Sequence, residues 1–202
     1  MEEHSGVAAK GDGMSVLILL EKVYEEAERV IANVSPDDMQ KPTPCDDWAV
    51  RDLLNHTISA VALLPTVVRN ETADWSQDFL GSDPAASFRA AATVNLAAWR
   101  IPGALDTPGP EKEEDGSPLP VVPGAKLVYM NLVDTFVHTT DLAKATGQTP
   151  DFDPNLAKTL LAAVQAIPFD SARASGAFGT KVEISEEAPP VDRLLAFLGR
   201  RP

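Results

Sequence analysis

Two histidines and one aspartate form the pattern in this sequence that points most directly to chemistry. His138 follows Asp134 by four residues, in the run Asp134-Thr135-Phe136-Val137-His138. Residues four apart on a helix share a face, with Cβ atoms roughly 5–6 Å apart, so a carboxylate oxygen and an imidazole nitrogen can reach one metal ion. His56, in another segment with helical spacing, can supply a third ligand. Three protein ligands and one open position are typical of a catalytic metal site.

Spacing alone leaves other interpretations of these residues open. Either histidine can be a core residue whose nitrogens are satisfied by neighbours, and an Asp/His pair four apart can be a surface hydrogen bond. Burial favours the metal, because Asp134, His138 and Asp141 follow one seam of a largely apolar segment. A divalent ion would neutralise carboxylates that are costly to bury alone. For Asp141 we expect contact with a ligand rather than with the ion.

The single cysteine and the tryptophans are interpreted more simply. Cys45 cannot form an intrachain disulfide, which favours a reducing, cytoplasmic location. A catalytic thiol needs a base nearby, and the sequence shows none beside Cys45, so we predict a structural role. Trp48 and Trp99 are predicted to lie in the core or in a pocket wall.

Composition limits the classes of function. The chain has 202 residues, 44% of them hydrophobic, which is enough for one domain with a sizeable core. The formal net charge of −13 argues against nucleic acid or an anionic membrane as partner, because phosphate binding requires clustered Lys and Arg. No segment has the run of apolar residues that a membrane helix needs. The sequence leaves a monomer and a homodimer equally open.

Hydrophobic periodicity predicts a mainly α protein built as a four-helix bundle, with a small mixed C-terminal section. Residues 1–13 are polar and are predicted to be a disordered extension, so the bundle domain spans 14–202. Pro65 is expected to kink the second helix or end its regular part, and Gly147 to end the fourth as a C′ glycine. The expected helices cover about 14–34, 49–69, 83–100, 125–146, 154–167 and 190–198, and a short strand covers 178–184.

A long stretch rich in Pro, Gly and Glu, residues 102–123, separates the third helix from the fourth. Loops of this length are usually functional or disordered. We interpret it as a short hairpin or as a mobile lid over a pocket.

Several runs together resemble the DinB-like metal-binding superfamily, in particular its actinobacterial branch related to mycothiol-dependent maleylpyruvate isomerase. The resemblance covers nearly the whole chain after the N-terminal extension. The matching runs are Thr43-Pro44-Cys45-Asp46-Asp47-Trp48, Val50-Arg51-Asp52-Leu53-Leu54-Asn55-His56, Val137-His138-Thr139-Thr140-Asp141-Leu142-Ala143, Ala145-Thr146-Gly147-Gln148, Phe178-Gly179 and the terminal Arg193-Leu194-Leu195-Ala196-Phe197-Leu198-Gly199-Arg200.

This resemblance implies a four-helix bundle with a metal, commonly zinc, in a central pocket. The ligands of the family are a histidine that ends the second-helix motif, here His56, and a Glu and a His four apart on a later helix. The last of these is His138, whereas the middle position holds Asp134 in place of Glu. Asp is one methylene shorter, so its carboxylate would reach the ion through a water or after a small helix shift. Similar enzymes use a low-molecular-weight thiol, mycothiol or bacillithiol, as cosubstrate.

Three hypotheses follow. The first is a metal-dependent transferase or isomerase that uses a mycothiol-type thiol and acts on a small molecule. The second is a non-catalytic small-molecule-binding protein with a weak or lost metal site, which Asp134 in place of Glu supports. The third is metal-assisted hydrolysis, in which a bound water attacks instead of a thiol. The sequence identifies neither the substrate nor the pathway.

Overall fold

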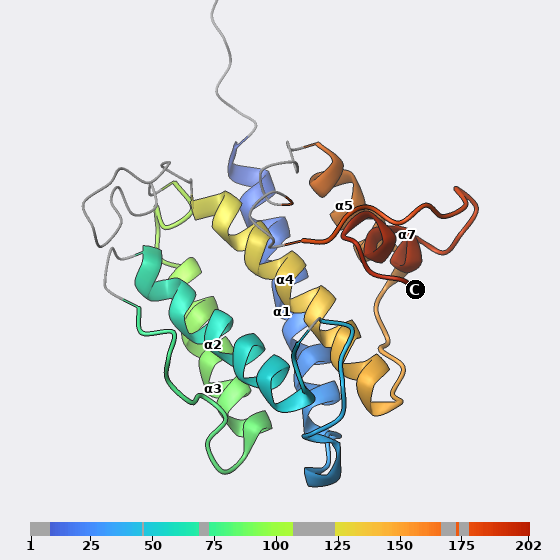
Figure 1. The fold of residues 1–202 in the computed structure, drawn as a ribbon. Helices are drawn as coiled ribbons and strands as arrows, with labels where there is room; N and C mark the ends of the chain where they lie inside the picture. The colour runs from blue at the N-terminus through green and yellow to red at the C-terminus, as the bar shows by residue number, and fades with distance from the viewer. Residues whose placement is uncertain (1–8, 46, 69–72, 107–123, 167–172, 174–177) are drawn as a thin grey trace, which may run out of the picture. The chain divides into compact units, whose positions relative to one another are not determined.

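The computed structural model describes residues 9–45, 47–68, 73–106, 124–166, 173 and 178–202 (Figure 1). The chain divides into two compact units, residues 1–150 and 151–202, which are described separately. The first helix begins at Ala9, so it includes residues that the sequence pattern assigns to the extension. Residues 1–8 and most of the 102–123 stretch lie outside the described part. The hairpin, the lid and the single domain over 14–202 therefore stay predictions.

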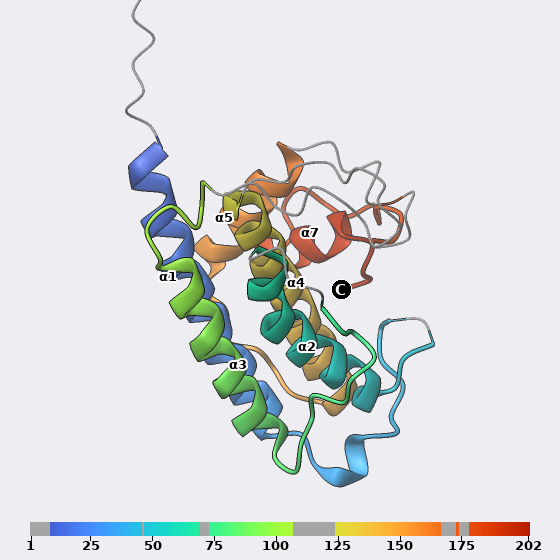
Figure 2. The same cartoon turned by 90° about the vertical axis from the view of Figure 1, so that its left-hand side faces the viewer.

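The first unit is the expected bundle of four long helices. They are α1 (Ala9–Ala32), α2 (Val50–Val68), α3 (Pro84–Trp99) and α4 (Gly124–Thr146), with a short 3₁₀ helix η1 (Pro36–Asp38) after α1. Helices α1 and α2 each pack against both α3 and α4, so the four close into a ring around one core (Figures 1 and 2). Fully buried side chains that fill this core include Leu20, Leu53, Leu54, Ile58, Phe88, Trp99, Leu132 and Phe136.

Tyr24 links helix α1 to both α3 and α4. The Tyr24 ring meets Phe88 of α3 edge-on, with 5.7 Å between ring centroids. Its hydroxyl donates a hydrogen bond to the side-chain oxygen of Asn131, on α4. Burial, and secondarily the charge of Asp134, raises the pKa of Tyr24 well above its usual value of 10.0. The hydroxyl therefore remains a neutral donor behind the polar seam of α4.

Helix α2 continues through Pro65 to Val68, so of the two expected effects of this proline, a kink or the end of the regular part, the second does not occur. Proline lacks an N–H and leaves the carbonyl of the residue four positions earlier, Val61, without its helical donor. The side-chain amide of Asn95, on α3, donates to that carbonyl at 2.8 Å. Asn95 is fully buried. A polar contact from the neighbouring helix thus compensates for the bond that Pro65 removes.

Helix α4 carries the polar seam and ends as expected. Gly147 follows it with φ of +71°, a left-handed conformation that glycine adopts without strain. The buried polar residues of α4 are Asn131, Thr135, His138, Thr139 and Asp141. The hydroxyl of Thr139 donates to the Thr135 carbonyl at 2.7 Å, so it is satisfied within the helix. Asn131 instead has a partner on another helix, because its side-chain oxygen accepts from Tyr24 of α1.

The second unit contains α5 (Pro154–Gln165) and α7 (Pro190–Phe197), which pack together. The strand predicted at 178–184 is absent from these described residues, so that prediction is wrong. The side chains alternate, but the backbone N–H of Val182 donates to the carbonyl of Ala196, at the end of α7, rather than to a partner strand. Gly199, at φ +86°, lies against Gly179 so closely that a Cβ would be 2.6 Å from the Gly179 Cα. Gly179 and Gly199, which belong to two of the runs that resemble the family, therefore form one close backbone contact.

Among the described residues, no helix is long and apolar enough to cross a membrane.

Candidate metal centre

The three residues predicted as metal ligands converge in the first unit. His138 Nε2 lies 3.3 Å from Asp134 Oδ1, and His56 Nε2 lies 3.8 Å from Asp134 Oδ2. One donor atom from each residue lies within 4.8 Å of the others. In a tetrahedral site with bonds of about 2.0–2.1 Å, ligand atoms are about 3.3–3.4 Å apart. We call this Nε2 side of His138, with His56 and Asp134, the inner side.

The side chains of the inner side suit a divalent cation. Asp134 Oδ2 is buried and has no hydrogen-bond partner. A buried carboxylate oxygen without a partner is costly, and a divalent ion between Asp134 and the two imidazoles would satisfy it. Two imidazoles and one carboxylate also form a donor set that zinc accepts. The Asp134 carboxylate lies within 3.8 Å of a ring nitrogen of each histidine.

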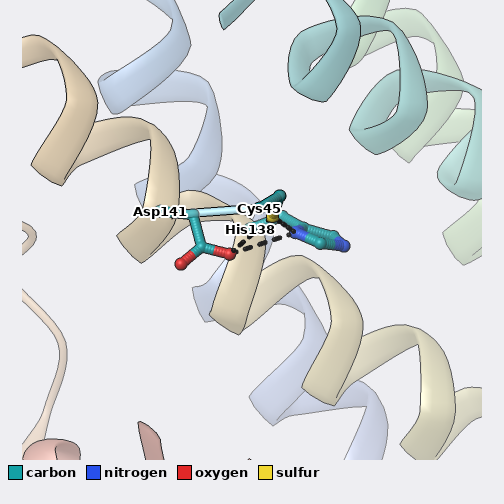
Figure 3. Close-up of side chains that lie close together, drawn as sticks. All are labelled: Cys45, His138 and Asp141. Carbon is teal, nitrogen blue, oxygen red and sulfur yellow. Dashed lines mark hydrogen bonds and ion pairs between the residues drawn. The ribbon is translucent and has the colours of Figure 1, made fainter. Parts of the chain in front are cut away.

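The other nitrogen of His138 faces a second pair of side chains. Nδ1 lies 3.4 Å from Asp141 Oδ2 and 3.8 Å from Cys45 Sγ. The Cys45 thiol donates to the same Asp141 oxygen at 3.3 Å. Figure 3 shows the Asp141 carboxylate and the Cys45 sulfur meeting at this edge of the ring. We call this Nδ1 side, with Cys45 and Asp141, the outer side.

The protein groups by themselves favour charge on both members of the Asp134–His138 pair. Burial alone would raise the pKa of Asp134, but the charge and hydrogen bond of His138, with the nearby charge of His56, hold it well below 3.8. Burial alone would lower the pKa of His138, but the charge of Asp134 and hydrogen bonds with Asp134, Asp141 and Cys45 raise it well above 6.5. A cation that binds His138 Nε2 must therefore displace a proton.

A compact loop before α2 places Cys45 and Trp48 beside the centre. The Thr43 hydroxyl donates to the carbonyl of Trp48 at 2.9 Å and accepts from the backbone N–H of Cys45 at 3.1 Å. Asp47 has φ of +63°, which turns the chain back. The Trp48 ring then lies 4.8 Å from the His56 ring, measured between centroids. The loop thus covers one edge of the imidazole pair.

An open cavity of about 380 Å³ reaches His56. This size lies within the range of small-molecule sites. Two tryptophans contribute its aromatic surface, and most of its other residues are polar. The lining consists of Trp48, Arg51, Asp52, Asn55, His56, Ser59, Trp75, Ser76, Gln77 and Asp78.

The structure confirms one expectation from sequence and changes another. Trp99 is buried in the core and Trp48 borders the cavity, as predicted. Cys45 was interpreted without a neighbouring base, yet it lies beside His138 and Asp141, so sequence reasoning missed its place in this cluster. A signal was present, because Cys45 shortly precedes α2 and His56 lies in the second turn of that helix. A loop so near His56 must also lie near any residue that His56 meets.

The four-helix bundle with a His/Asp/His cluster between its helices defines a mainly α, DinB-like protein. Residues 20–143 match the sequence model of the mycothiol maleylpyruvate isomerase N-terminal domain, and the chain belongs to this family. Two uncharacterized proteins, from two strains of Mycobacterium tuberculosis, are each 31% identical over 194 residues. These matches cover 93% of this chain and 98% of each relative. No solved structure matches the chain.

Proposed function

We propose that this protein binds a divalent cation, with zinc the expected ion, through His56, Asp134 and His138. We further propose that it uses a low-molecular-weight thiol of the mycothiol type as a transferase or isomerase of a small molecule. The observation that carries the proposal is the buried Oδ2 of Asp134, which has no hydrogen-bond partner between two imidazoles. Membership in a family named for a mycothiol-linked isomerase supports the choice of thiol.

Each residue of the centre has a role in this proposal. His56, Asp134 and His138 hold the cation, and Asp141 accepts from His138 Nδ1 so that Nε2 faces inward. The cavity beside His56 and Trp48 takes the thiol or the second substrate. A bound divalent ion with one open position lowers the pKa of a thiol or water, and it can also polarise a carbonyl. Asp134 supplies the single carboxylate, so the loaded centre keeps positive charge, which favours an anionic thiolate.

The proposal is tested by the metal content and the thiol-dependent turnover of the wild type, His56→Ala and His138→Ala. We expect the wild type to retain a divalent ion after purification without metal-affinity chromatography, and both variants to lose it together with turnover. Metal content that neither substitution changes would refute the ligand assignment. Turnover that persists without added thiol would instead favour hydrolysis by a bound water.

A second candidate function is small-molecule binding without catalysis, and Asp134 in the position of a family Glu favours it. The discriminating variant is Asp134→Glu. A large gain in metal affinity would mean that the native carboxylate is too short for tight binding and would support the non-catalytic protein. Unchanged or weaker affinity would mean that Asp134 is already matched to the distances between these histidines.

A further inference from the structure

The Cys45 thiol is the feature of this cluster to which the proposed function gives no role. It is the single cysteine of the chain and lies on a loop outside the bundle helices, yet its sulfur is 3.3 Å from Asp141 Oδ2. The loop holds it there through Thr43, whose hydroxyl contacts both the N–H and the carbonyl of Cys45. The position of the thiol is thus fixed by the local backbone.

Asp141 is the group that receives the hydrogen bond of this thiol. Its side chain is only 2% exposed, and a buried carboxylate is stable only where donors surround it. One Asp141 oxygen, Oδ2, faces two donors at once, the ring nitrogen of His138 at 3.4 Å and the thiol of Cys45 at 3.3 Å. The thiol therefore helps to orient the Asp141 carboxylate toward His138.

We infer that Cys45 is a positioning residue of the metal centre: its S–H fixes Asp141, which fixes His138 with Nε2 toward His56 and Asp134. This inference rests on the proposed function, because it assigns His138 Nε2 to the cation. Carboxylates that accept from the far nitrogen of a ligating histidine set its tautomer and its ring orientation. Here the loop before α2 adds one more link, so that the loop and α4 support the same imidazole (Figure 3).

The same three side chains could instead ligate a cation themselves, since their donor atoms are also within 4.8 Å of one another. The hydrogen bonding distinguishes the two sides. On the outer side, Asp141 Oδ2 already accepts from the Cys45 thiol, whereas on the inner side Asp134 Oδ2 has no partner. The oxygen that lacks a partner marks the place for a cation, and the satisfied oxygen marks a support.

The test compares the wild type with Cys45→Ser, which keeps a donor, and Cys45→Ala, which removes it. Affinity for Zn²⁺ is measured by competition with a chelator, and the Co²⁺-loaded proteins are examined for a thiolate-to-cobalt absorption band. We expect Cys45→Ala to bind about 10-fold more weakly, at the lower end of the effect of such supporting groups, and Cys45→Ser to recover most of the loss. The Co²⁺ spectrum of the wild type should lack the thiolate band.

A matched control is Thr139→Val, which removes a buried hydroxyl one residue from His138 that donates within its own helix. We expect its metal affinity to stay within about twofold of the wild type. If Cys45→Ala does not fold, methyl methanethiosulfonate can convert the thiol of the folded protein to a methyl disulfide, releasing methanesulfinic acid. This removes the S–H donor, and a reductant should restore the affinity.

Three results would overturn the inference. They are wild-type affinity in Cys45→Ala, a Cys45→Ser variant as weak as Cys45→Ala, and a thiolate band in the wild type that Cys45→Ser abolishes. The last would make Cys45 a ligand. A wild type that binds no cation would refute the proposed function as well. Retention of metal by the wild type, with its loss in His56→Ala, distinguishes failure of this inference from failure of that function.

Discussion

The two sides of His138 use similar chemical groups in opposite ways. On the inner side, a carboxylate and a second imidazole approach Nε2, and one buried oxygen of Asp134 lacks a partner. On the outer side, a carboxylate and a thiol approach Nδ1, and the Asp141 oxygen accepts from the thiol. Exposure differs as well, since the Asp134 side chain is 29% exposed and that of Asp141 only 2%.

This difference shows how one imidazole can be oriented through Nδ1 while its Nε2 stays accessible to a ligand. On the outer side the Asp141 carboxylate is buried and accepts from a neighbouring thiol, which suits a supporting contact. The inner side is partly open, adjoins the cavity at His56 and leaves an oxygen without a donor. A cluster of polar groups is therefore better judged by which atoms lack partners than by which residues are close together. The predictions that follow test this division.

The largest effects are expected when the shared residue is removed. His138→Ala should abolish tight metal binding and also cost the metal-free protein about 3 kcal/mol of unfolding free energy, because Asp141 and Asp134 each lose a buried partner. His56→Ala should abolish tight binding as well, yet change that free energy by less than about 1 kcal/mol, since His56 is a third exposed. Chelator competition and denaturant unfolding measure the two quantities. Equal destabilisation by both variants would contradict the division.

The next effect separates the two carboxylates. Asp134→Asn should weaken metal affinity on the order of 10²- to 10³-fold, because a charged ligand is lost from a small donor set. Asp141→Asn should weaken it about 10- to 100-fold, the range for groups that orient a ligand. Isothermal titration with Zn²⁺ gives both constants. A larger loss in Asp141→Asn than in Asp134→Asn would exchange the roles of the two sides.

A smaller effect is expected from pH. The raised pKa of His138 means that affinity for a cation should keep increasing above pH 6.5, by up to about tenfold per pH unit, until the pH passes that pKa. The metal-free protein should behave in the opposite way. The stability that protonated His138 contributes is complete below 6.5 and is lost as pH rises through the raised pKa.

Asp134 acts at the acid end of the same pH range. Its depressed pKa contributes stability above 3.8 that is lost as pH falls. Dissociation constants and unfolding midpoints between about pH 3 and 9 test both groups. In Asp134→Asn, the rise of metal affinity should level off at a lower pH, because His138 loses the carboxylate that raises its pKa. A metal affinity that does not change above pH 7 would contradict the pairing.

The smallest effect on the metal is expected from Asp38, a carboxylate of η1 whose partners are Ser35 and Lys41. Hydrogen bonds, first from Lys41 and then from Ser35, lower the pKa of Asp38 to about 2. Asp38→Asn should therefore remove stability that is present above 3.8 and lost as pH falls through about 2, and acid unfolding should begin at higher pH. Metal affinity should remain that of the wild type. Thermal unfolding at pH 3 to 7 checks the first expectation and chelator competition the second.

Much of the bundle could be predicted because its signals are local. The spacing of apolar residues predicted 125–146 for a helix that spans Gly124–Thr146, and Pro84 begins α3 as expected from Asp83-Pro84. The C-terminal strand failed because alternation describes one segment, whereas a strand requires a partner. At Val182 that partner is the carbonyl of Ala196, on a helix.

The candidate site divides in the same way. Asp134 and His138 lie one turn apart, so helix geometry predicts their approach, and the same reasoning places Asp141 next to His138. Cys45 precedes His138 by 93 residues, and its contact depends on the turn at Asp47 and on the packing of α2 against α4. The short separation of Cys45 from His56 in the sequence indicates only that the loop lies near the start of α2. Non-local contacts of this kind require coordinates.

The pairing of Pro65 with Asn95 has a consequence for the alignment of α2 along its own axis. Apolar contacts are not directional, so they specify the alignment of two helices less sharply than a buried hydrogen bond does. The Asn95 amide donates to the one backbone carbonyl that Pro65 leaves without a donor. A shift of α2 along its axis would leave that carbonyl oxygen and the Asn95 nitrogen both without a hydrogen bond in the core. The contact at Pro65 thus also fixes the position of His56 along the axis of α2, although the proline lies nine residues further along the chain.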